Sequence, residues 1–84
     1  MTLAFTKEER FIISLYEYLQ SNQATHQSFS FDLIEKQLGY PERFIRNTLK
    51  QFIRANFIKS VGHNEATLLP HGEQLVKKLQ ERLR

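Results

Sequence analysis

No cysteine occurs in the 84 residues of this sequence. That absence excludes disulfide bonds, thiolate nucleophiles and cysteine-based zinc sites, and it fits a reducing compartment. No apolar run approaches the roughly 20 residues that a membrane-spanning helix needs, and the N-terminus lacks a signal-peptide pattern. We therefore expect a cytoplasmic protein, with residues 1–84 forming one domain whose small core is sufficient without disulfides or metal.

The sequence also lacks the patterns that mark common catalytic and metal sites. Its three glycines are scattered, so no glycine-rich loop is available to bind a phosphate group. Carboxylates are not paired at a useful spacing, and His26, His63 and His71 lie in predicted loops without a second histidine four residues later. We therefore predict that the protein is not an enzyme and has no cofactor, metal or small-molecule ligand.

Positive charge is concentrated in one part of the chain. The formal net charge is +3, yet residues 41–59 contain five Lys or Arg residues and one acidic residue, a local net charge of +4. Proline at position 41 suits the first turn of a helix, and the following pattern predicts a helix over 41–55. At about 100° per residue, one side of that helix is polar. This basic stripe consists of Arg43, Asn47, Lys50 and Arg54.

The opposite side of the same helix is apolar and is expected to face a core. Its members are Ile45, Thr48, Leu49 and Phe52, with Phe44 and Ile53 at the margins. Cations clustered on one helix face are typical of phosphate binding. Asn47 adds a side-chain amide that can pair bidentately with adenine. The sequence thus favours nucleic-acid binding, while a simply solvated helix face is the alternative.

Two helices are predicted before the basic one. Thr6 and Glu9 form a capping box, which indicates a helix start at residue 7. Apolar residues at helical spacing continue this first helix over 7–21. Its expected buried side consists of Phe11, Ile12, Leu15, Tyr16 and Leu19.

Residues 21–30 are polar and rich in turn formers, so we predict a loop that ends in a short edge strand. Ser30 can cap the second helix, 31–38. The side of this helix expected to be buried consists of Leu33, Ile34 and Leu38. Gly39 and Tyr40 then form the turn that leads to the basic helix.

A short hairpin is predicted after the basic helix. Asn56 tolerates the left-handed conformation that often ends a helix, and the following residues are rich in aromatic and β-branched side chains. We predict a hairpin over 57–69 whose tip carries His63 and Glu65. A final helix over 71–84 completes the chain.

The order of these elements resembles the second half of a winged helix-turn-helix domain. The residues that carry the resemblance are Leu38, Gly39, Ile45, Leu49, Phe52, Asn56, Phe57 and Ile58. In that family the position of Asn56 is usually glycine. Residues 66–75 are similar to the junction between the wing and the last helix in regulators of the MarR and PadR type, with Leu69 where Thr or Ser usually caps the helix.

The resemblance implies a mainly α fold with a small β-hairpin: a three-helix core, a short wing and a C-terminal helix. It implies that helix 41–55 enters the major groove of double-stranded DNA, as the recognition helix of a helix-turn-helix does. We expect Arg43, Asn47 and Lys50 to face bases. The residues expected on phosphates are Arg46, Arg54, Lys59 and Lys36.

The final helix carries an apolar stripe that extends to its last turn. Its members are Leu75, Val76, Leu79 and Leu83. We expect this stripe to pair two copies of the chain as a homodimer, with the apolar arm 1–5 available to cover it. The alternative is a helix that folds back across the first helix and buries the same leucines within one chain.

Two functions from different classes agree with these patterns. The first is sequence-specific binding of duplex DNA by a small transcriptional regulator. The second is a winged-helix module that binds an acidic protein through the same basic helix. Protein-binding hot spots favour Trp, Tyr and Arg in an apolar setting, and the basic stripe contains no aromatic residue. The sequence therefore favours DNA.

Overall fold

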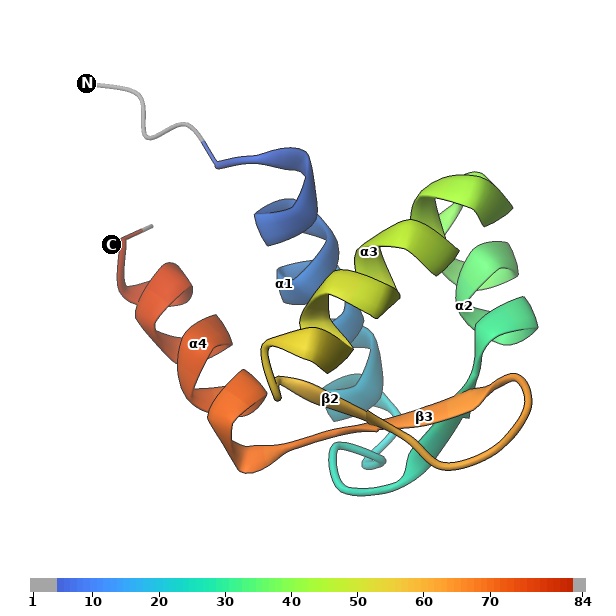
Figure 1. The fold of residues 1–84 in the computed structure, drawn as a ribbon. Coiled ribbons are helices and arrows are strands. Elements are labelled where there is room, and N and C mark those ends of the chain that lie inside the picture. Colours follow the sequence, from blue (N-terminus) through green and yellow to red (C-terminus); the bar gives the residue numbers. More distant parts are fainter. Residues whose placement is uncertain (1–4, 83–84) are drawn as a thin grey trace.

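Four helices and three short strands make up the computed structural model, which describes residues 5–82 (Figure 1). In chain order the elements are α1 (Lys7–Ser21), β1 (Ser28–Ser30), α2 (Phe31–Leu38), α3 (Glu42–Arg54), β2 (Ile58–Ser60), β3 (Glu65–Leu68) and α4 (Pro70–Glu81). The predicted class is therefore confirmed: the protein is mainly helical and has a small antiparallel sheet.

Helix α1 begins at the predicted capping box and supplies much of the core. The Thr6 hydroxyl accepts a hydrogen bond from the Glu9 N–H at 3.1 Å, and the Glu9 carboxylate accepts one from the Thr6 N–H at 2.8 Å. Satisfying two otherwise unpaired N–H groups fixes the helix start. All of the predicted core residues of this helix are buried, and Ile13 is buried as well. Helical periodicity alone thus identified the buried side of α1 nearly completely.

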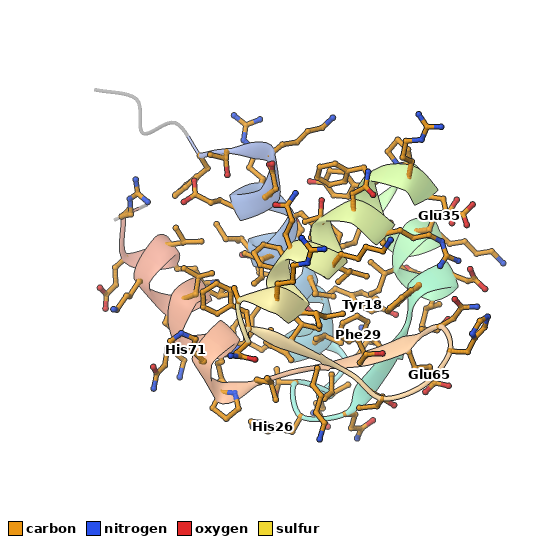
Figure 2. The ribbon with its side chains drawn as sticks, in the orientation of Figure 1. Tyr18, His26, Phe29, Glu35, Glu65 and His71 are labelled. Carbon is orange, nitrogen blue, oxygen red and sulfur yellow. The ribbon has the colours of Figure 1, made fainter. Side chains whose placement is uncertain are left out.

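The sheet has three strands in the order β1-β3-β2, and both pairings are antiparallel. The predicted edge strand is β1, which pairs Phe29 with Ala66, while Ile58 pairs with Leu68. All four of these side chains are buried. Figure 2 shows Phe29 in the interior, where the sheet meets the helices. The hairpin strands β2 and β3 are thereby joined to the segment before α2 as well as to each other.

The boundaries of α3 and the start of α4 differ from the prediction by one residue, and α4 ends three residues before the predicted end at residue 84. Pro41 is the residue before α3 and not its first turn, and Ala55 follows the helix. Asn56 has a φ of 62°, so the predicted left-handed residue after the helix is confirmed. Helix α4 starts at Pro70 and ends at Glu81, and Arg82 is its C-cap. Residues 1–4 of the predicted arm and residues 83–84 of the predicted last helix lie outside the described residues.

The start of α4 lies very close to the beginning of β2. The Leu69 N–H donates to the Phe57 carbonyl at 2.9 Å. A Cβ atom at Gly72 would overlap the same carbonyl oxygen, and Leu68 Cδ1 would be 2.9 Å from it. Glycine is therefore required here for a close approach of helix to backbone. This contact sets where α4 leaves the sheet.

Helix α4 packs along α1, and this packing corrects the predicted dimer interface (Figure 1). Val76 is 0% exposed and Leu79 is 3% exposed, because both side chains fill the core of their own chain. They cannot also form an interface between two copies. Leu75 is half-buried, and Leu83 lies outside the described residues. The fold-back that the sequence left as an alternative is what the structure shows for Val76 and Leu79.

The predicted burial of one α2 residue is also wrong. Ile34 is fully buried and Leu38 is half-buried, but Leu33 is 41% exposed. An eight-residue helix that packs mainly through its contacts with α3 and β1 has a narrow buried side. Leu33 lies beside that side instead of within it. Ser30 caps the helix as predicted, since its hydroxyl accepts a hydrogen bond from the Leu33 N–H at 3.4 Å.

Candidate nucleic-acid interface

The two sides of α3 have the predicted environments. Ile45, Thr48 and Leu49 are buried, whereas Phe52, which was predicted on the same side, is half-buried, as are Phe44 and Ile53 at the margins. On the other side, each member of the basic stripe is exposed. Within residues 5–82, no ion pair or side-chain hydrogen bond engages Arg43, Lys50 or Arg54. The stripe is therefore a line of charged and amide groups that are available to a ligand.

An aromatic cluster fixes the first turn of α3 on α1. The Tyr40 and Phe44 rings stack with centroids 5.0 Å apart, and both make T-shaped contacts with the Phe11 ring, with centroid distances of 5.4 and 5.8 Å. Lys7 Nζ lies 5.0 Å from the centroid of the Phe44 ring. Such edge and stacked pairs contribute beyond the area that they bury. They give the helix a fixed rotation, which directs Arg43 outward.

Arg46 has surroundings unlike those of the stripe. Its Nε donates to Glu42 Oε1 at 2.9 Å, and its Nη1 donates to Asn64 Oδ1 at 3.3 Å. The guanidinium carbon lies 5.9 Å from the centroid of the Phe31 ring. The side chain is 40% exposed. The structure thus separates Arg46 from the other predicted DNA-binding residues of α3, because two of its five N–H donors already have partners within the chain.

The two predicted cations outside α3 are exposed. Lys36 lies in the last turn of α2, immediately before the turn that leads to α3. Lys59 is the central residue of β2, and it alternates with the buried Ile58. Its side chain therefore extends from the opposite face of the strand. Both side chains are therefore accessible to a ligand.

The tip of the hairpin is small and only partly free. Residues 61–64 connect β2 to β3, and His63 among them is exposed. Glu65 is not at the tip: it begins β3, and its carboxylate accepts a hydrogen bond from the Ser28 hydroxyl at 3.3 Å. Figure 2 places Glu65 at the end of the hairpin that lies far from α4. The carboxylate is therefore held towards β1 instead of extending beyond the loop.

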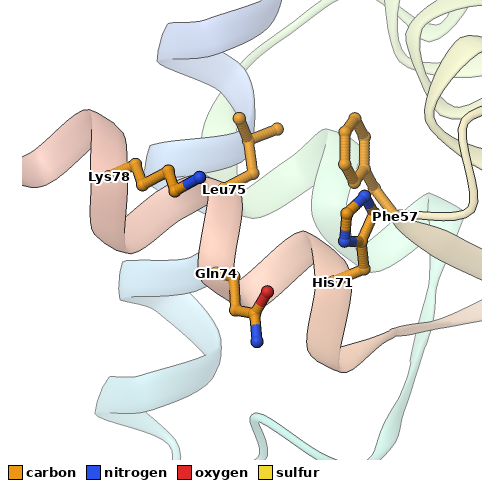
Figure 3. A pocket seen from close by; sticks show the side chains of 5 residues that line it. All are labelled: Phe57, His71, Gln74, Leu75 and Lys78. Atoms are coloured by element: carbon orange, nitrogen blue, oxygen red, sulfur yellow. The ribbon is translucent and has the colours of Figure 1, made fainter.

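A shallow cavity of about 160 Å³ lies where α4 starts beside β2 (Figure 3). The rings of Phe57 and His71 stack at its edge, with centroids 4.9 Å apart. The other lining residues are Gln74, Leu75 and Lys78. Sequence patterns gave no sign of this cavity, because it depends on two segments that meet only through the close approach at Gly72. Among the described residues, no group of three or more His, Asp or Glu side chains could hold a metal ion.

Comparison with protein-family models, with curated proteins and with solved structures finds no match for this chain. Within residues 5–82, no helix has the length and apolar character needed to cross a membrane. The functional conclusion therefore depends on the arrangement of the residues themselves.

Proposed function

We propose that this chain is a winged helix-turn-helix domain that binds double-stranded DNA sequence-specifically, as a small transcriptional regulator, with α3 in the major groove. The order α2, turn, α3 and hairpin supports the fold assignment. The observation that carries the functional proposal is the exposure of the whole basic stripe on a helix whose opposite side is buried. A helix fixed in this way presents three cations and one amide to a single ligand surface.

The dimensions of the stripe suit a duplex. From Arg43 to Arg54 the helix rises about 16 Å, which corresponds to about five base-pair steps. Arginine and lysine pair with guanine O6 and N7, and asparagine pairs with adenine N6 and N7. In this proposal Arg43, Asn47 and Lys50 contact base edges. Arg54 lies on a phosphate at the end of the helix.

Exposed cations outside α3 extend the proposed contact to the DNA backbone. Lys36 precedes the turn before α3, and Lys59 follows α3 on the next strand. Each phosphate neutralised by such a side chain releases condensed counterions, so binding weakens as salt rises. Contacts of this kind fix the position of a protein on the duplex, whereas base contacts determine the sequence that it prefers.

A homodimer on a palindromic site remains part of the proposal, but it requires an interface other than the one predicted. Val76 and Leu79 are in the core of the chain. Among the described members of the predicted interface, only Leu75 is partly accessible. Sedimentation at micromolar concentration, with and without a duplex, tests whether one or two copies bind.

The decisive experiment measures duplex binding by fluorescence anisotropy across salt concentrations from about 50 to about 200 mM. We expect binding at low salt that weakens steeply with salt, and selection from random DNA should then give a preferred sequence. Lys50→Gln should weaken binding. The matched control is Lys78→Gln on α4, which removes the same charge outside the stripe and should leave duplex binding nearly unchanged.

Two results would overturn the proposal. One is the absence of duplex binding at low salt. The other is equal weakening by the two lysine substitutions, because this would mean that only total charge matters. The protein-interaction module would instead be favoured if the protein binds an acidic peptide and has the same affinity for random DNA as for selected DNA. Two large apolar side chains, Leu33 and Val61, are exposed and would be available to such a partner.

A further inference from the structure

Three separate segments meet around the Arg46 side chain. The guanidinium is hydrogen-bonded to Glu42 in the preceding turn of α3 and to Asn64 in the hairpin loop, 18 residues away along the chain. It also lies over the ring of Phe31, the first residue of α2. We call these four residues the Arg46 cluster. It joins α2, α3 and the hairpin loop at one point.

Asn64 connects this point to the backbone. Its side-chain oxygen accepts the hydrogen bond from Arg46 Nη1, while its carbonyl oxygen accepts one from the Phe31 N–H at 2.9 Å. The loop is therefore fixed to the first residue of α2 by its main chain and to α3 by its side chain. Because the loop has only four residues, 61–64, these two bonds restrict most of its freedom.

The chemistry of the cluster requires a guanidinium. Two of its nitrogen atoms donate in different directions within one plane, and its guanidinium carbon lies over the Phe31 ring, 5.9 Å from the centroid. A lysine ammonium has the same charge but neither the fork nor the flat face. The Glu42 carboxylate at 2.9 Å already balances the positive charge. The Arg46 charge is thus compensated within the chain, unlike the charges of the basic stripe.

We infer that Arg46 is a positioning residue for DNA binding: acting through Asn64, it holds the hairpin loop beside α3, and it is not one of the cations that neutralise phosphates. This inference rests on the proposed function and revises the role predicted for Arg46. It assigns a function to Asn64, which the sequence did not single out. Loss of the cluster lets the loop move relative to the basic stripe, so the ordered surface offered to the duplex becomes smaller.

The test compares three substitutions in the cluster with one matched control. Arg46→Lys keeps the charge and removes the fork, Arg46→Gln removes both, and Asn64→Ala removes the loop partner without changing charge. Arg54→Gln is the control, since it removes the same group as Arg46→Gln from an exposed position of the same helix. Duplex affinity is measured for each variant across the salt series, and thermal melting followed by circular dichroism confirms that each is folded.

We expect all three cluster variants to bind the duplex about fivefold more weakly, a loss comparable to one exposed hydrogen bond, with an unchanged salt dependence. The double variant Arg46→Gln with Asn64→Ala should lose no more than either single variant, because the two residues act as one unit. Arg54→Gln should instead reduce the slope of log affinity against log salt by about 0.9. Native affinity in Arg46→Lys, or a slope reduced by about 0.9 in Arg46→Gln, would overturn the inference.

A measurement without DNA separates this inference from the proposed function. In the native protein the Phe31 amide should exchange slowly with solvent, and exchange should become several-fold faster in Arg46→Lys and in Asn64→Ala. Unchanged exchange in both variants would show that the cluster does not hold the loop, and would overturn the positioning role even if DNA binds. If exchange accelerates but the native protein binds no duplex, the proposed function fails while the mechanical role of the cluster stands.

Discussion

Gly72→Ala offers a sharp test of the structure, because helix propensity and packing predict opposite signs. Alanine in place of glycine normally stabilises a helix by up to about 1 kcal/mol. At Gly72, however, the new methyl group would overlap the Phe57 carbonyl oxygen and press on the Leu68 side chain. The carbonyl is backbone, and it accepts a hydrogen bond from the Leu69 N–H, so it cannot move away without breaking that bond.

The magnitude follows from these contacts. Overpacking of a core typically costs about 1 to 3 kcal/mol, and weakening of one backbone hydrogen bond adds about 1 kcal/mol. After the propensity gain is subtracted, we expect Gly72→Ala to lower the free energy of unfolding by about 1 to 3 kcal/mol. For a domain of this size each kcal/mol lowers the melting temperature by about 4 to 8 °C. Thermal melting by circular dichroism therefore resolves the effect easily.

The other two glycines provide internal controls for this prediction. A Cβ at Gly62 would have Glu65 Cβ as its nearest neighbour, at 3.7 Å, so Gly62→Ala should leave the melting temperature almost unchanged. Gly39 has open space around it but a φ of 74°, and Gly39→Ala should cost about 1 kcal/mol through the left-handed backbone alone. A melting temperature that is unchanged or raised in Gly72→Ala would refute the close approach of α4 to β2.

Three further predictions concern the core and the proposed DNA contact. Leu49→Ala should lower the free energy of unfolding by about 2 to 5 kcal/mol, as measured by urea denaturation, and an unchanged midpoint would mean that α3 is rotated from the orientation described. Leu79→Glu should unfold the chain, because it buries a carboxylate without a partner, whereas Leu75→Glu should remain folded. If circular dichroism shows that Leu79→Glu is folded and sedimentation shows that it is a monomer, the predicted dimer interface would be restored. Asn47→Ala should cost about 1 to 3 kcal/mol on the selected DNA sequence and leave the salt dependence unchanged, and a loss that is equal on random DNA would exclude base recognition by this residue.

The parts of the fold that were predicted from the sequence depend on local chemistry. The capping box at Thr6, the cap at Ser30 and the left-handed Asn56 each involve residues within a few positions of one another. Helical periodicity, which is equally local, identified the buried side of α1 and of α3. For these reasons the limits of α1 and α2 agree with the prediction to the residue.

The sequence could not settle matters that depend on neighbours far away in the chain. An apolar stripe shows that Val76 and Leu79 must be covered, but it does not show whether α1 or a second copy covers them. Arg46 has the same charge as Arg43, so composition could not distinguish a residue paired with Asn64 from one that is free. The close approach at Gly72 likewise depends on the position of Phe57. Such pairings become visible only when the chain is folded.

The pairing of β1 with β3 has a consequence for the order in which the protein folds. Its paired residues, such as Ser28 and Thr67, are far apart in the chain, and the segment between them contains α2 and α3. Closing the sheet therefore closes a long loop around the proposed DNA-binding helix, a slow step compared with helix formation. A chain still being made on the ribosome cannot complete this pairing until Thr67 has emerged. We expect α3 not to reach its final position in the fold until that moment. A partly synthesised chain would therefore contain the basic stripe but could not bind a specific DNA site.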